Sequence, residues 1–178
     1  GKKLFKLFGY KSSIYFYLIY ILTSILIICS WLVFPNTVLF IFLVVASYHF
    51  GKEDTVFSFK RKFLISEFLF FLKGSSVILM PLLLKKAETI EIFRILNFNV
   101  FESSIFTDQF LIVTLFLSFL SSLYISQKKN ANLIGIMVMD FFSLFILNFF
   151  LTPVLAFTLY FCFLHSIRHS IKLIFELD

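Results

Sequence analysis

The three histidines of this chain are the side chains best suited to chemistry, because each lies in or at the end of a strongly apolar segment. His165 and His169 are four residues apart within the apolar stretch 154–174, so in a helix both imidazoles lie on one face. His49 ends a second apolar stretch. Ionisable groups inside a membrane are costly and usually functional. The pattern predicts a metal site; the alternative is that each histidine hydrogen-bonds a neighbouring helix.

The residue types favour redox chemistry over hydrolysis. Imidazole binds iron, zinc, copper and nickel, and two or three neutral histidines that leave open positions suit ferrous iron that binds O2. The sequence contains no Ser/His/Asp arrangement, CxxC pair, HExxH motif or phosphate-binding glycine loop. We therefore expect Fe(II) as cofactor and an apolar substrate that enters from the bilayer.

Three carboxylates could support these ligands. Glu53 and Asp54 follow His49 and could orient its ring, although solvation at a helix end explains them equally well. Asp140 could bind the metal, accept a hydrogen bond from an imidazole N–H, or pair with Arg168. We favour the hydrogen-bond acceptor.

The composition is that of an integral membrane protein, with 60% apolar residues and 29 phenylalanines among 178 residues. Phenylalanine could line a channel for a long conjugated ligand or simply fill lipid-facing positions. The net charge is +6, but the basic residues cluster at the ends of apolar runs, which is typical of membrane orientation and does not indicate nucleic-acid binding. Cys29 and Cys162 fall within apolar segments, so no disulfide framework is expected.

Hydropathy predicts one all-α membrane domain over 1–178, a transmembrane bundle with about six spans and more in a full-length protein. Residues 1–12 are expected to form a cytoplasmic loop and 85–108 an interfacial segment. The expected spans are 13–34, 37–50, 63–84, 109–127, 132–149 and 154–174.

Alternation of these spans places most basic residues on one side, so both ends of the chain are expected in the cytoplasm, with the protein in the cell membrane. At about 1.5 Å per residue, His49 lies roughly 20 Å from the outer end of its helix, and His165 and His169 roughly 18 and 24 Å from Pro153. Asp140 reaches about 12 Å in from the cytoplasmic side. The polar groups are therefore expected to converge on one layer.

Two blocks of sequence carry a family resemblance. Residues 47–54 read Ser-Tyr-His-Phe-Gly-Lys-Glu-Asp, residues 160–169 read Tyr-Phe-Cys-Phe-Leu-His-Ser-Ile-Arg-His, and Lys73-Gly74 followed by Pro81 lies between them. In order and spacing they resemble the Brp/Blh family of bacterial and archaeal membrane β-carotene 15,15′-dioxygenases. The resemblance extends from about Val38 onward, though residues 85–132 match mainly in hydropathy.

The resemblance implies that iron and O2 split the central double bond of β-carotene into two molecules of retinal, often for a retinal-binding rhodopsin of the same cell. It also implies that His49, His165 and His169 bind the iron and that Asp140 stands where relatives carry an acidic residue. An earlier Pro-His-Gly-type motif of the family is missing here, and the sequence begins with Gly1 rather than methionine. We therefore expect a fragment that lacks the first helix and its histidine.

Two other functions use the same residues. A haem-binding membrane electron carrier would use His49 with His165 or His169 as axial ligands. A transporter would use Asp140, Lys73 and the histidines as a proton path, but no pair of similar broken helices indicates an inverted repeat.

Overall fold

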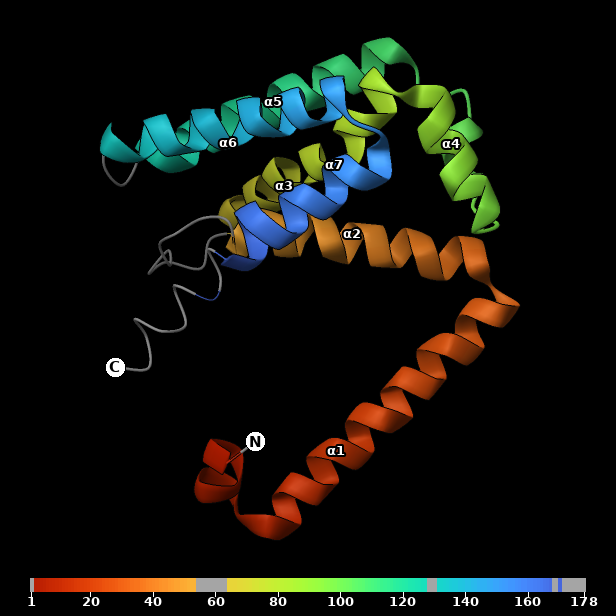
Figure 1. Ribbon diagram of the computed structural model, residues 1–178, viewed down its shortest axis with the longest axis vertical. Coiled ribbons are helices and arrows are strands. Elements are labelled where there is room, and N and C mark those ends of the chain that lie inside the picture. Colours follow the sequence, from red (N-terminus) through yellow and green to blue (C-terminus); the bar gives the residue numbers. More distant parts are fainter. Residues whose placement is uncertain (1, 54–63, 128–130, 168–169, 171–178) are drawn as a thin grey trace.

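The computed structural model describes residues 2–53, 64–127, 131–167 and 170 (Figure 1). Its elements are helices joined by short turns, and no residue within these ranges belongs to a strand. The prediction of an all-α membrane bundle is therefore confirmed. The elements are α1 (Lys2–Val33), α2 (Pro35–Glu53), α3 (Leu64–Leu84), α4 (Lys86–Ile95), η1 (Val100–Glu102), α5 (Asp108–Gln127), α6 (Ala131–Phe150), α7 (Pro153–Leu159) and η2 (Tyr160–Ser166).

Helices lie over the first five expected spans, and the described start of the last one, 154–167, is divided into α7 and the π-helical η2. Among the described residues, three stretches are long and apolar enough to cross a membrane: Ile14–Val33, Ile65–Leu84 and Asp108–Ser126. Ile134–Phe150 and Pro153–Ser166 are shorter apolar helices. The chain is thus built for an apolar environment.

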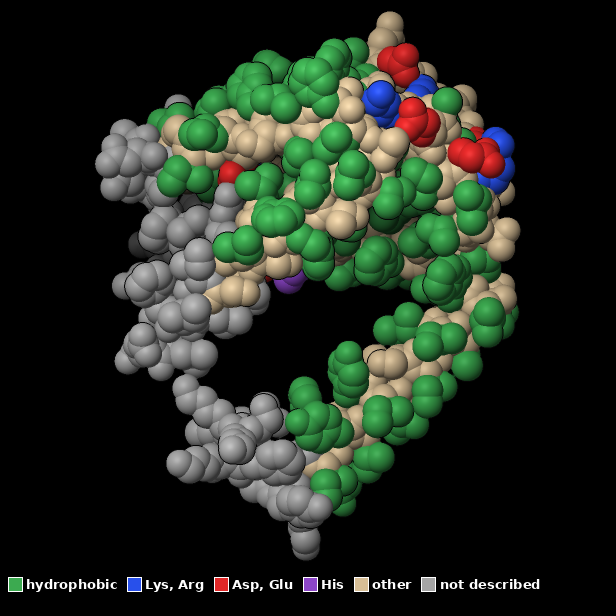
Figure 2. All heavy atoms as spheres, in the orientation of Figure 1, with side chains coloured by type: hydrophobic (Ala, Val, Ile, Leu, Met, Phe, Trp, Pro, Cys, Tyr) green, Lys and Arg blue, Asp and Glu red, His purple; other side chains and the backbone are tan. Residues whose placement is uncertain are grey.

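The first helix differs from its expected bounds. It begins at Lys2, where a loop over 1–12 is expected, and no proline interrupts that stretch. Figure 1 shows α1 leaving the other helices at an angle, and its apolar window is 0% buried. Figure 2 shows hydrophobic side chains along it. Little of α1 therefore contributes to the core.

Helix α3 is the centre of the bundle, where it contacts α2, α4, α5 and α6. Small residues permit these close approaches, as they do between membrane helices in general. Ser118 of α5 is fully buried, and its hydroxyl donates to the carbonyl oxygen of Lys73 at 3.0 Å. Ser76 donates to the same oxygen at 2.8 Å.

The contact between α2 and α3 is made backbone to backbone. A Cβ atom on Gly74 would overlap the carbonyl oxygen of Ser47, and one on Gly51 would overlap the carbonyl oxygen of Phe70. Both glycines are needed because only a residue without a side chain permits this approach. His49 lies between Ser47 and Gly51, so this contact sets its position.

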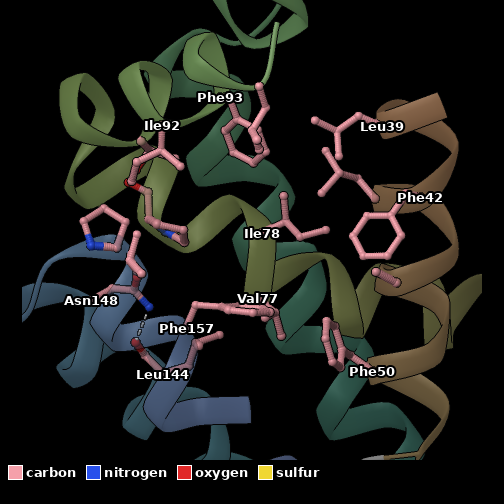
Figure 3. A pocket seen from close by; sticks show the side chains of 17 residues that line it. Leu39, Phe42, Phe50, Val77, Ile78, Ile92, Phe93, Leu144, Asn148 and Phe157 are labelled. Carbon is pink, nitrogen blue, oxygen red and sulfur yellow. Dashed lines mark hydrogen bonds between the residues drawn. The ribbon is translucent and has the colours of Figure 1, made fainter. Parts of the chain in front are cut away.

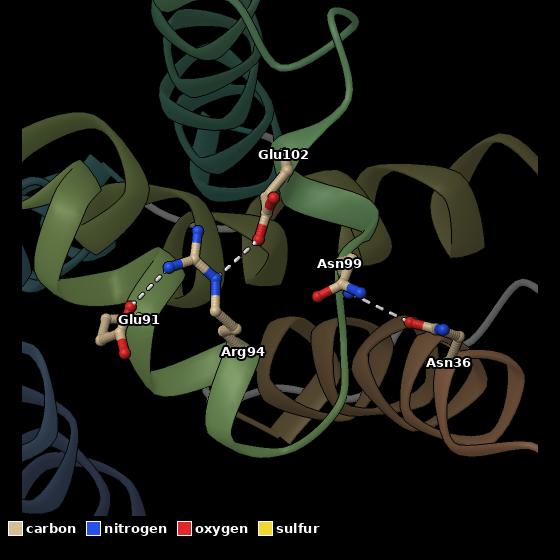
Figure 4. A network of polar contacts seen from close by, with 5 residues as sticks. All are labelled: Asn36, Glu91, Arg94, Asn99 and Glu102. Carbon is tan, nitrogen blue, oxygen red and sulfur yellow. Dashed lines mark hydrogen bonds and ion pairs between the residues drawn. The ribbon is translucent and has the colours of Figure 1, made fainter.

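Polar contacts at the opposite end of α2 hold α4 and η1 in place (Figure 4). Arg94 binds Glu102 at 3.2 Å and Glu91 at 2.9 Å, and the backbone N–H of Asn99 donates to Asn36 Oδ1 at 3.0 Å. Figure 2 shows acidic and basic side chains gathered around this end. The α4–η1 segment is thereby tied to the first turn of α2.

Replacement of Gly74 by alanine should lower the free energy of unfolding by about 1–3 kcal/mol, because the new methyl group must push α2 away from α3. Gly135→Ala in α6 is the matched control, since a Cβ there meets nothing within 4 Å. The control should be neutral or stabilising by about 0.4–1 kcal/mol. Denaturation in detergent followed by circular dichroism measures both, and equal effects would contradict the close contact.

Candidate metal centre

Two of the three histidines meet in the structure. His49 in the last turns of α2 and His165 in η2 have ring centroids 5.4 Å apart, with ring planes at 67°. His165 is buried, with 5% of its surface exposed, whereas His49 is exposed. Figure 2 shows a histidine side chain on the face of the bundle toward α1. One member of the pair is therefore accessible from outside the bundle.

The separation of the two rings fits ligands of one metal ion. With metal–nitrogen bonds of about 2.1 Å, two imidazoles that share an ion at 90–110° have centroids roughly 4.5 to 5.3 Å apart. The observed 5.4 Å is within a small side-chain adjustment of this range. Axial ligands on opposite faces of one haem would need about 6.4 Å by the same bond length. The pair thus fits adjacent ligand positions better than opposite ones.

Aromatic rings hold His165 in its orientation. Phe50 meets it edge-on at 4.9 Å, and Phe161 stacks on it at 5.6 Å and 23°. Phe157 stacks on Phe161 at 6.0 Å, one turn earlier. These rings exclude water from one side of the imidazole and restrict its rotation.

The π-helical conformation of Tyr160–Ser166 is a feature that the sequence reasoning missed. Such segments are rare and frequently occur at functional sites. The expected shared face of His165 and His169 assumes regular α-helix, but His169 lies outside the described residues, as do Asp54 and Arg168. Within the described part of the chain, no group of three or more His, Cys, Asp or Glu side chains is arranged to hold a metal ion.

Asp140 lies in the middle of α6 and is half-buried. It lines a cavity of about 30 Å³ together with Lys73, Ser122 and Tyr160, so it faces the centre of the bundle. Tyr160 connects this cavity to the aromatic cluster, because its ring lies 5.9 Å from that of Phe50. Asp140 therefore neighbours the aromatic cluster around His165 through the bundle interior.

A polar network beside His49 was not anticipated. Tyr48 donates to Glu67 of α3, Lys52 donates to the Tyr48 hydroxyl, and Lys52 lies 3.6 Å from Glu67. The Tyr48 hydrogen bond raises the pKa of Lys52. The network joins the end of α2 to the start of α3 on either side of His49, while Glu53 is half-buried at the last position of α2.

A comparison with protein families gives a match over nearly the whole chain. The model described as "Beta-carotene 15,15'-dioxygenase" matches residues 2–178. No curated protein and no solved structure matches the chain.

If His49 and His165 share an ion, His49→Ala and His165→Ala should each lower the affinity for a divalent metal by more than the roughly 10- to 100-fold that loss of an outer-shell partner costs. Equilibrium dialysis of the purified protein against ferrous or cobalt ions measures this loss. Ser166→Ala, next to His165, is the control and should bind as the parent does. Unchanged affinity in either histidine variant would exclude a shared site.

Proposed function

Because this chain belongs to the β-carotene 15,15′-dioxygenase family, we propose that it splits the central double bond of β-carotene with O2 at a ferrous ion held by His49, His165 and His169. The observation that supports the ion is the close approach of His49 and His165, 5.4 Å between centroids. The family supports the carotene substrate.

The proposed reaction balances without a further reductant. The carbon–carbon double bond and the O2 bond both break, and each oxygen atom becomes the aldehyde oxygen of one retinal. Iron supplies the activation of O2 when it is bound. The polyene has no proton to remove and no leaving group, so the chain needs no general acid or base.

The protein then has to hold the ion's ligands in place and shield them from water. Phe50 and Phe161 fix the His165 ring and keep water from one side of it. The exposed His49 leaves the ion reachable from the lipid side, where a hydrocarbon substrate is dissolved. Asp140, Glu53 and Asp54 would act from outside the ligand set, by orienting ligands or balancing charge.

The setting we propose is the cell membrane, with both ends of this chain in the cytoplasm. Carotenoid and O2 both concentrate in the apolar phase, and a retinal-binding rhodopsin would be the natural recipient of the product. The apolar helices support this environment. The spacing of His49 and His165 disfavours these two as the axial ligands of a haem, since it is too short for opposite faces; His169, the other axial candidate, lies outside the described residues.

Production of retinal from β-carotene should require ferrous iron and O2, and should fall to background in His49→Ala, His165→Ala and His169→Ala. Each change removes a proposed ligand without adding a charge. The assay is chromatography of retinal formed in detergent, with and without a ferrous chelator or O2. Undiminished turnover with chelator, or a Soret band in the purified protein, would contradict the iron dioxygenase.

For Asp140→Asn we expect an intermediate loss of turnover, about 10- to 100-fold, because it removes an outer-shell charge but no ligand. Glu67→Gln is the matched carboxylate-to-amide control, since Glu67 bonds Tyr48 at the exposed end of α3. It should retain most activity. Equal losses in the two variants would show that Asp140 has no special relation to the iron.

A further inference from the structure

A cavity of about 290 Å³ lies between α2, α3, α4, α6 and α7, next to the histidine pair (Figure 3). This volume is close to the lower limit of roughly 300 Å³ for small-molecule pockets. Apolar side chains form nearly all of its wall, among them Phe42, Ile78 and Phe93. Such a wall suits a hydrocarbon ligand.

The cavity is elongated along α2. Its wall includes Leu39 near the start of the helix and Phe50 near the end, and eleven residues of helix span about 16 Å. Phe50 is the ring that contacts His165 at 4.9 Å. One end of the cavity thus lies beside the metal centre, and the other lies under α4.

We infer that this cavity holds one complete ring-bearing arm of the carotenoid, with the ring under α4 and the central double bond at the histidine pair. The inference rests on the proposed function. An extended chain advances about 3.3–3.6 Å for every three bonds, so the roughly nine bonds from the central carbon to the ring span about 11 Å, and the ring adds about 3 Å. The sum, near 14 Å, matches the distance along α2 from the histidine level to Leu39.

The far end of the cavity limits how far a substrate can enter. Ile92, Phe93 and Leu96 form its wall there (Figure 3). The ion pair of Arg94 with Glu102 joins α4 to η1, and the Asn99–Asn36 bond ties this segment to the first turn of α2 (Figure 4). A stop at a set distance from the pair fixes which bond of the polyene lies at the metal.

The two polar side chains of the wall already donate to the backbone. Thr89 donates to the carbonyl oxygens of Pro81 and Lys85, and the Asn148 amide nitrogen donates to that of Leu144. Thr89 thus has no hydrogen left for a ring substituent, while Asn148 has a second amide hydrogen and a carbonyl oxygen. Because the rest of the wall is apolar, an unsubstituted hydrocarbon ring fits it best.

Binding tests the cavity apart from catalysis. Ala46 lines it midway, and Ala46→Phe should lower retention of β-carotene by the metal-free protein roughly 10-fold or more, measured by visible absorption after gel filtration in detergent. Val45→Phe, on the exposed face of the same helix, should bind as the parent does. Equal retention by the two variants would overturn the proposal, whereas normal binding without cleavage would overturn the proposed function alone.

A substrate switch tests the stop even if Ala46→Phe fails to fold. Leu39→Trp shortens the cavity at the end that would hold the ring. The kcat/KM for β-carotene should therefore fall roughly 10- to 100-fold. For a polyene hydrocarbon that keeps the central double bond but has one short, ringless arm, kcat/KM should fall less than about threefold. Ile41→Trp, exposed on α2, is the control with unchanged preference. An unchanged ratio of the two substrates in Leu39→Trp would refute the arm-binding cavity.

Discussion

The backbone contact between α2 and α3 at Gly51 and Gly74 is the constraint on which the rest of this structure depends. Helix axes in soluble proteins lie about 8–10 Å apart, and side chains at the crossing set that distance. Two glycines facing the carbonyl oxygens of Phe70 and Ser47 remove the side chains and let the helices approach further. Lipid gives helices no hydrophobic drive to associate, so dense packing of this kind has to supply it. The same crossing carries His49, two residues before Gly51, so the stability of the bundle is coupled to the position of this histidine.

The position of His165 is set in a different way, by a π-helical turn and stacked aromatic rings. A π-helical turn rotates and displaces the residues that follow it relative to regular helix, and the stack of Phe157, Phe161 and His165 then defines the direction of the imidazole. One histidine is positioned by backbone packing and the other by aromatic packing. The backbone contact and the aromatic stack lie in separate segments of the chain. His49 and His165 therefore come together only when the tertiary structure forms.

The sequence predicted what depends on length and apolarity. Helix rise placed His49 and His165 at one depth, and the structure brings them together. The sequence could not predict how each helix is rotated about its axis, because hydropathy does not distinguish neighbouring faces of a helix that is apolar all round. Asp140 shows this: its depth was estimated, but it faces the cavity with Lys73 and Tyr160. The Tyr48–Glu67 bond could not be predicted either, because it joins residues 19 positions apart on two helices. The π-helical turn has no signal in the hydropathy pattern.

To cleave a symmetrical polyene at its centre, an enzyme has to select one double bond by its distance from the end of the molecule, because successive double bonds are chemically similar. Under the proposed arrangement the reference distance runs between two helices, from the ring end of the cavity under α4, which directly follows α3, to His49 on α2. One residue of helix rises about 1.5 Å, close to the roughly 1.2 Å that one bond advances along an extended chain. A shift of α2 against α3 by a single residue would therefore move the cut by about one bond. The glycine crossing prevents that shift, so the contact that holds the bundle together would also select the bond that is broken.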